Sequence, residues 1–184
     1  MKLKLISGNK GKISELKTLL SPFEFECVDF ELEEIQSLDP NIVISHKIQE
    51  ARKKLEGDII VEDTSLFFEA LSGKLPGPYA RSFLEVLKPE GLFNLTQKLG
   101  NSKATALSII GYSDSLGNIS FFEGSQEGEI VFPRGLNGFG WSTIFLPVGS
   151  HKTYGEMEQK EKLESSHRTY STKKFKEFLE KKHE

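Results

Sequence analysis

The order of local patterns in the first 63 residues constrains the fold of this chain more than any other feature. They predict in turn a strand, a helix, a strand, a helix capped by Asp39 and a strand, at 2–7, 10–20, 23–30, 40–55 and 58–63. This alternation is typical of an α/β fold with parallel pairing. In such folds, ligands bind outside the carboxyl ends of the strands.

The rest of the chain has a different pattern. Residues 103–114 and 119–132 predict an antiparallel hairpin with a corner at Gly117-Asn118. A glycine-rich loop, a short strand at 144–147 and a charged helix from about Ser165 complete the chain. We expect one α/β domain, 1–184, with a mixed twisted central sheet, flanking helices and a hairpin lobe that forms a cleft.

Composition narrows the class of protein. A chain of 184 residues with 37% hydrophobic and 28% charged residues is typical of one soluble globular domain. The net charge of −3 argues against a general nucleic-acid coat, and no stretch reaches the roughly 18 apolar residues of a membrane span. The single cysteine, Cys27, which we expect to be buried, favours a reducing compartment and hence the cytosol.

A basic turn follows the first predicted strand. The segment "SGNKGKISEL", 7–16, places Lys10 and Lys12 where a helix begins. Backbone N–H groups at a helix N-terminus favour an anion, so the turn is a candidate phosphate site, although its spacing is not that of the Walker loop. The alternative is a solvated surface turn.

Acidic residues follow the other predicted strands. Glu62 and Asp63 end the run at 58–63, and Glu33 and Glu34 follow the second strand. Carboxylates that share a sheet edge repel one another unless a metal cation or a lysine lies between them. Mg²⁺ needs only one or two carboxylates besides phosphate oxygens. The alternative is a pair of solvated acids, but the basic turn on the same predicted edge favours a metal–phosphate site.

Two later segments suit a planar ligand. Phe139 lies between glycines and beside Trp141, so a base could stack there, although ordinary core packing is the alternative, especially for Trp141. His167 and Arg168, after Lys162, could donate hydrogen bonds to the acceptor edge of a base. His167 taken alone is more often structural.

Four separated segments, read together, have the order and approximate spacing of one known family. They are "SGNKGKISEL", "VEDTSLFFEALSGKLPGPYARSF", "GFGW" and "KTYGEMEQKEKLESSHR". Over nearly its full length the chain resembles the inosine triphosphate pyrophosphatase (Ham1-like) family. The resemblance implies a Mg²⁺-dependent, homodimeric, cytosolic enzyme that cleaves ITP, dITP and XTP to the monophosphate and pyrophosphate.

The resemblance also implies roles for individual residues. Glu34 and Asp63 would bind the metal, and Asp63 would also be the general base for attack of water at the α-phosphorus. The implied substrate-binding residues are Ser7, Gly8, Asn9, Lys10, Gly11, Lys12, Lys47, Thr64, Arg81, Phe139, Gly140, Trp141, Ser142, Lys162, His167 and Arg168.

One position departs from the family pattern. The family usually carries Asp after "GFGW", where this chain has Ser142. We therefore expect hydrolysis to be intact and the preference among purine bases to be weaker than usual.

Two other classes of function remain open at this stage. A nucleotide sensor without turnover would use the same site, but the retained metal acids argue against it. A single-stranded nucleic-acid module built on Phe139, Trp141 and the lysines near the C-terminus is disfavoured by the net negative charge. The expected partner is thus a small nucleotide, with no nucleic acid and no membrane.

Overall fold

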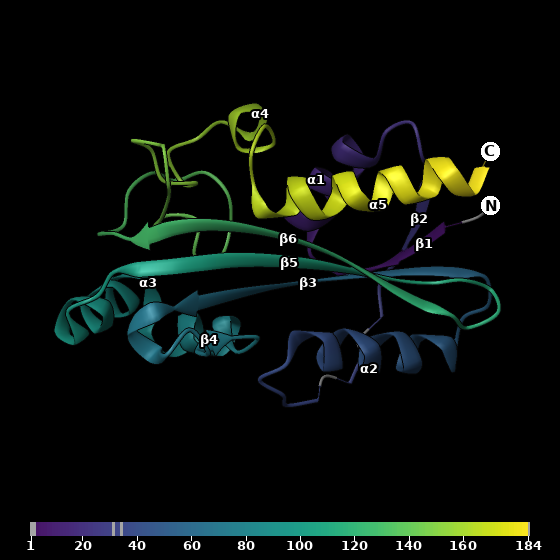
Figure 1. Ribbon diagram of the computed structural model, residues 1–184, viewed down its shortest axis with the longest axis horizontal. Helices are drawn as coiled ribbons and strands as arrows, with labels where there is room; N and C mark the ends of the chain where they lie inside the picture. The colour runs from purple at the N-terminus through teal and green to yellow at the C-terminus, as the bar shows by residue number, and fades with distance from the viewer. Residues whose placement is uncertain (1–2, 31, 34, 184) are drawn as a thin grey trace. The chain divides into compact units, whose positions relative to one another are not determined.

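The computed structural model describes residues 3–30, 32–33 and 35–183 (Figure 1). Its strands are β1 (Leu3–Ile6), β2 (Phe25–Val28), β3 (Asp58–Phe68), β4 (Pro76–Gly77), β5 (Lys103–Ser113), β6 (Ile119–Ile130) and β7 (Phe145–Pro147). Its helices are α1 (Lys10–Leu20), α2 (Pro40–Arg52), the 3-10 turn η1 (Glu69–Leu71), α3 (Ala80–Leu99), α4 (Gln159–Lys162) and α5 (His167–His183).

The strands form one mixed sheet, which confirms the predicted α/β class with flanking helices. Their order is β2-β1-β3-β5-β6-β7, and β4 pairs with β3. β1 runs parallel to both β2 and β3, whereas β4 and β7 run antiparallel to β3 and β6. β5 and β6 form the predicted hairpin, in which Gly117 takes a φ of 92° and the Asp114 carboxylate accepts the Asn118 backbone N–H at 2.9 Å.

The chain divides into two compact units. Unit 1 comprises Met1–Asp63, Ser108–Gly124 and Arg168–Glu184, and unit 2 comprises Thr64–Leu107 and Ser125–His167. β3, β5 and β6 each contribute residues to both units. The two units are described one at a time below.

Unit 1 has helices on both faces of its part of the sheet. α1 and α5 cover one face and α2 covers the other (Figure 1). Leu5, Ile60 and Ile110 share a core with residues of α1 and α5. On the opposite face, Gly111 leaves room for α2: a Cβ at this position would lie 2.2 Å from Cγ2 of Ile44. Successive residues of a strand point to opposite faces, so Ile110 faces α1 and α5 whereas its neighbour Gly111 faces α2.

The start of α2 confirms the predicted cap. The Asp39 carboxylate accepts the Asn41 N–H at 2.9 Å, and Pro40 occupies the first turn. Buried Ile44, Ile48 and Ala51 then hold this helix against the sheet. Lys47, a polar residue of α2, therefore extends from a helix that is packed on the sheet.

Unit 2 has its own core. Leu66 and Phe68 of β3 pack there with Phe145 and with Leu92 of α3. Helix α3 was not predicted. It is interrupted at Lys88, whose φ of 59° and ψ of 170° precede Pro89, so the sequence signal of one continuous helix is lost.

Two local expectations were wrong. β3 does not end at Asp63 but continues to Phe68, because Leu66 and Phe67 pair with β4. Cys27 is exposed rather than buried, because β2 is the outermost of the described strands of the sheet.

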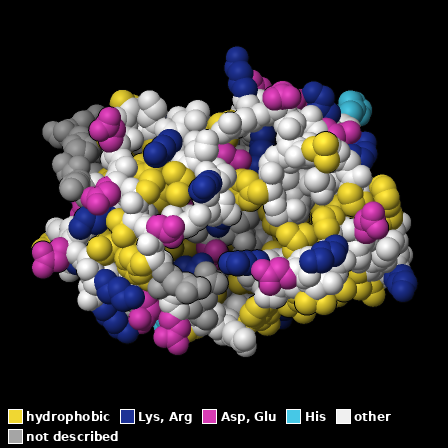
Figure 2. Space-filling model, turned by 180° about the vertical axis from the view of Figure 1, so that it is seen from behind, with side chains coloured by type: hydrophobic (Ala, Val, Ile, Leu, Met, Phe, Trp, Pro, Cys, Tyr) yellow, Lys and Arg dark blue, Asp and Glu magenta, His cyan; other side chains and the backbone are white. Residues whose placement is uncertain are grey.

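The distribution of surface charge and the character of the helices are consistent with the composition of the chain. Acidic and basic side chains are intermixed over the face drawn in Figure 2. In the described part of the chain, no helix combines the length and the apolar character that crossing a bilayer requires.

Candidate active site

The carboxyl ends of three parallel strands meet at one edge in unit 1. Ile6 of β1 is in register with Val28 of β2 and with Val61 of β3. The residues that follow at this level are Ser7, Asp29 and Glu62. Pairing with β1 ends at Val61, so Glu62 and Asp63 lie at the end of the parallel part of β3 although the strand itself continues. This is the edge at which the sequence predicted a ligand site.

The turn between β1 and α1 brings the first lysines to this edge. The Ser7 hydroxyl accepts the Asn9 N–H at 3.2 Å, and the Asn9 side chain caps α1 by accepting the Lys12 N–H at 3.0 Å. Gly8 passes close to Asp29: a Cβ on Gly8 would lie 2.8 Å from its Oδ1. Lys12 therefore extends from a well-defined first helical turn.

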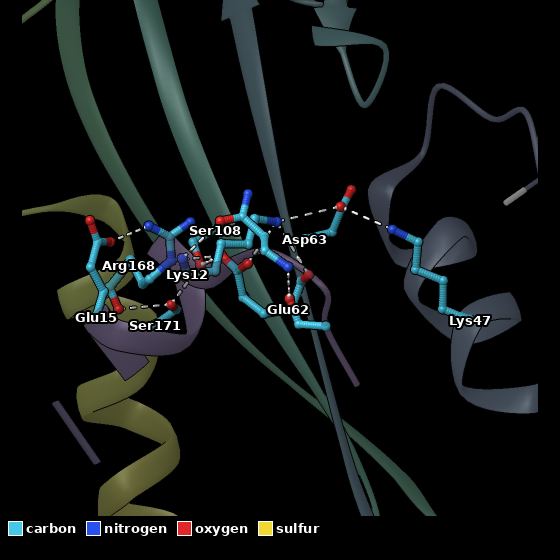
Figure 3. A network of polar contacts seen from close by, with 10 residues as sticks. Lys12, Glu15, Lys47, Glu62, Asp63, Ser108, Arg168 and Ser171 are labelled. Atoms are coloured by element: carbon cyan, nitrogen blue, oxygen red, sulfur yellow. Dashed lines mark hydrogen bonds and ion pairs between the residues drawn. The ribbon is translucent and has the colours of Figure 1, made fainter. Parts of the chain in front are cut away.

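The predicted meeting of basic and acidic residues is confirmed. Nζ of Lys12 lies 2.9 Å from Oε2 of Glu62 and 4.0 Å from Oδ1 of Asp63. Lys47, from α2, lies with Nζ 3.1 Å from the same Oδ1 of Asp63. Figure 3 shows the Asp63 carboxylate between these two lysines.

Glu62 is the buried centre of the network in Figure 3. Its Oε1 accepts hydrogen bonds from Nε of Arg168 at 3.1 Å and from the Ser108 hydroxyl at 2.8 Å. Burial on its own would raise the pKa of the Glu62 carboxyl, but the charges of Arg168 and Lys12 and the hydrogen bonds outweigh burial and lower this pKa. Glu62 is thus ionised and committed to its neighbours.

Arg168 connects α5 to both α1 and β3. Besides Glu62 it contacts Glu15 of α1 through Nη1, and its side chain is 1% exposed. The Ser171 hydroxyl donates to the backbone oxygen of Arg168 at 3.1 Å and contacts the Ser108 hydroxyl at 2.9 Å. The sequence predicted Arg168 as a base donor and did not predict this ionic network.

Unit 2 holds a cluster of rings around a buried lysine. Nζ of Lys162 lies 5.0 Å from the ring centroid of Phe139 and 5.5 Å from that of Tyr154. Both distances are in the range of cation–π attraction. The His167 ring lies 5.3 Å from the Trp141 ring and 5.8 Å from the Tyr154 ring, and His167 is buried. Four of these five residues, all except Tyr154, are predicted substrate-binding residues.

Ser142 closes the loop that carries Phe139. Its hydroxyl donates to the Phe139 carbonyl at 2.7 Å and accepts the Phe139 N–H at 3.3 Å. The flanking Gly138 and Gly140 have φ values of 76° and 63°, a conformation that favours glycine. Ser142 is therefore a turn-closing residue here.

Other predicted site residues are placed as follows. Lys10 and Gly11 lie in the first turn of α1, and Thr64 follows Asp63 on β3, as the first residue of unit 2. Arg81 is exposed on α3, in unit 2, with Nε 3.0 Å from Oε1 of Glu85. Glu34, the second predicted metal ligand, lies outside the described residues.

Sequence reasoning missed Glu15, Ser108, Ser171 and Tyr154. Glu15 is a buried acid in α1, and only its place beside Leu16 on the inward-facing side of the helix could have indicated it. The two serines lie on β5 and α5 with no local signal, because their contact depends on how the helix packs on the sheet. Tyr154 stood in the quoted "KTYGEM" segment without a role.

Comparisons with known proteins identify the family of this chain. A model of the Ham1 family matches residues 3–178. An inosine triphosphate pyrophosphatase of Schizosaccharomyces pombe is 39% identical over 159 residues, which cover 85% of this chain and 84% of that protein.

Two solved structures are similar to the chain over most of its length. The Ham1 protein of Staphylococcus aureus matches 98% of this chain and 100% of its own, with a TM-score of 0.81 and 29% identity. A Mycobacterium abscessus nucleoside-triphosphatase, described as a dITP/XTP pyrophosphatase, matches 91% of this chain and 95% of its own, with a TM-score of 0.69 and 27% identity. The family match over nearly the whole chain places this protein in the Ham1 family.

Proposed function

We propose that this protein hydrolyses the triphosphates of deaminated purines, ITP, dITP and XTP, to the monophosphate and pyrophosphate. The S. pombe relative carries the name of this activity, and the M. abscessus protein is named for dITP and XTP. In the structure, the observation that carries the proposal is the convergence of Lys12, Lys47 and Asp63 at one sheet edge.

The residues at this edge suit phosphoryl chemistry. Attack of water at the α-phosphorus requires a proton acceptor and neutralisation of the pyrophosphate leaving group. Asp63 is the proposed acceptor, because its side chain is 17% exposed and Glu62 is already committed. Lys12 and Lys47 supply positive charge, and the N-terminus of α1 supplies backbone N–H groups.

A divalent metal fits this donor set. Among the described residues no group of three or more His, Cys, Asp or Glu side chains forms a complete cage. Mg²⁺ is commonly held by one or two carboxylates, with phosphate oxygens and water completing its octahedron. We propose that Asp63, with Glu34, holds it. When bound, Mg²⁺ would neutralise charge on the phosphates.

The ring cluster of unit 2 suits a purine. Phe139 and Trp141 offer faces for stacking, and Lys162 and His167 carry nitrogens that can donate to an acceptor. A 6-oxo purine presents an acceptor where adenine presents an amino donor, so a donor-lined pocket favours inosine and xanthine. Arg168, which follows His167 in the chain, is held by Glu62 and Glu15, so we propose that it fixes the start of α5 rather than donating directly to the base.

Assembly and location are further proposals. The family resemblance implies a homodimer, and the single cysteine is consistent with the cytoplasm. Sedimentation at micromolar concentration tests the dimer: a monomer there would contradict it.

The function is tested with a panel of nucleoside triphosphates scored for pyrophosphate release, with and without Mg²⁺. We expect ITP and XTP to be cleaved to monophosphate and pyrophosphate only with the metal. Asp63→Asn should lower kcat by about 10²- to 10⁴-fold, the usual contribution of a general base. No pyrophosphate from ITP at high enzyme concentration would contradict the proposal and favour a nucleotide sensor.

A further inference from the structure

A single carboxylate oxygen of Asp63 faces two ammonium groups. Oδ1 lies 3.1 Å from Nζ of Lys47 and 4.0 Å from Nζ of Lys12. The Lys47 side chain is 8% exposed, so solvent screens its pair with Asp63 only weakly. Figure 3 shows Lys47 approaching Asp63 from the α2 side and Lys12 from the other.

The Asp63 carboxylate is also the proposed metal ligand. Mg²⁺ binds carboxylate oxygens at about 2.0–2.1 Å, so an ion on Oδ1 would be within a few ångströms of the Lys47 ammonium. Two cationic centres on one oxygen in a poorly solvated site repel each other. Lys47 and a divalent ion are therefore competitors for Asp63.

Lys12 does not replace Lys47 as the partner of Asp63, because Lys12 is paired with Glu62. Its Nζ is closer to Glu62, at 2.9 Å, than to Asp63. Glu62 is in turn held by Arg168 and Ser108. Of the two lysines, Lys47 is the closer to Asp63, with Nζ 3.1 Å from Oδ1 against 4.0 Å for Lys12, so Lys47 is the side chain that must yield.

We propose that Lys47 is a counter-ion that keeps the free protein from binding a divalent cation tightly, so that the cation enters together with the polyphosphate. Phosphate oxygens offer the Lys47 ammonium alternative acceptors, and its long flexible stem allows the transfer while α2 stays fixed. This inference rests on the proposed function and adds the order in which the cation and the nucleotide bind. Before substrate is bound, Lys47 acts as a positioning residue that holds the Asp63 carboxylate.

The experiment measures Mn²⁺ binding to the full chain by electron paramagnetic resonance, first with the metal alone. A second series contains an ITP analogue with a methylene group between the α- and β-phosphorus atoms. For the wild type we expect weak binding of Mn²⁺ alone and about tenfold or greater tightening with the analogue, within the usual range of coupling between two ligands.

Neutral variants remove the competitor. Lys47→Met and Lys47→Gln should each bind Mn²⁺ alone about tenfold more tightly than the wild type, whereas Lys47→Arg, which keeps the charge, should not. Lys53→Met is the matched control, because Lys53 lies at the end of the same helix and pairs with Glu50 at the surface. It should bind Mn²⁺ like the wild type.

Three results would overturn the inference. The first is that the wild type and both neutral Lys47 variants bind Mn²⁺ with equal affinity. The second is that Lys53→Met gains as much Mn²⁺ affinity as the neutral Lys47 variants. The third is that the wild type binds Mn²⁺ as tightly without the analogue as with it. Pyrophosphate release from ITP is measured on the same wild-type samples. Its absence would contradict the proposed function, whereas the comparison of Mn²⁺ alone tests the role of Lys47 independently.

Discussion

Lys12 on α1 and Glu62 on β3 lie 50 residues apart in the chain, yet Nζ of Lys12 is 2.9 Å from Oε2 of Glu62. The pair exists because β1 and β3 are parallel and in register up to Ile6 and Val61, so the residues beyond them share one edge. Glu62 holds the ammonium beside Asp63, where the proposed chemistry requires it.

Removing the Lys12 ammonium should weaken catalysis strongly. Lys12→Met should lower kcat/KM for ITP by about 10- to 150-fold, because a hydrogen bond to a charged group contributes about 1.5–3 kcal/mol. Steady-state kinetics measures this. Lys17→Met, an exposed lysine on the same helix, should keep wild-type kinetics. Wild-type kcat/KM in Lys12→Met would contradict the assignment.

The Glu62 network should make the free energy of unfolding depend on pH in the acidic range. Its neighbours lower the pKa of Glu62, so below the ordinary value of about 4.3 the unfolded chain binds a proton that the folded chain does not. The stability from this group is present above that pH and is lost as the pH falls. Urea unfolding from about pH 7 to about pH 3 should therefore show a steeper loss in the wild type than in Glu62→Gln.

The exposed Glu180 on α5 provides the control for that titration. Glu180→Gln should keep the wild-type dependence of the unfolding free energy on pH. If Glu62→Gln also kept it, the folded-state pKa of Glu62 would not be lowered.

Gly111 should not tolerate a side chain. In Gly111→Ala the new Cβ would lie 2.2 Å from Cγ2 of Ile44 and 2.9 Å from Cδ1 of Ile48. We expect a loss of about 1–3 kcal/mol in the unfolding free energy, as for other overpacked cores. Ile44→Ala in the same chain should offset part of this loss, which a double-mutant cycle in urea detects. Strict additivity would contradict the packing of α2 on β5.

Ser142 should weaken discrimination among purine bases. Its hydroxyl is engaged by the Phe139 backbone and provides no carboxylate, unlike the Asp usual in the family. The ratio of kcat/KM for ITP over GTP should stay below the factor of about 10⁴ that well-matched polar sites reach. Ser142→Asp should raise this ratio. A GTP rate vanishingly small beside the ITP rate in the wild type would contradict the prediction.

The sequence was most informative where neighbours in the chain decide the structure. The Asp39 cap of α2 and the turn before Lys12 depend on residues within a few positions, and parallel pairing then brings Lys12 to the acids. The contact of Arg168 with Glu15 spans 153 residues and depends on the packing of α5 against α1. Local patterns carry no such information, and the break at Lys88 likewise hid α3.

The most direct test of the account is where the oxygen of the attacking water ends up. The enzyme would turn over ITP with Mg²⁺ in water enriched in oxygen-18, and mass spectrometry would locate the label in the products. Attack at the α-phosphorus predicts label in inosine monophosphate and none in pyrophosphate. Label in pyrophosphate, or products consisting of inosine diphosphate and orthophosphate, would contradict it.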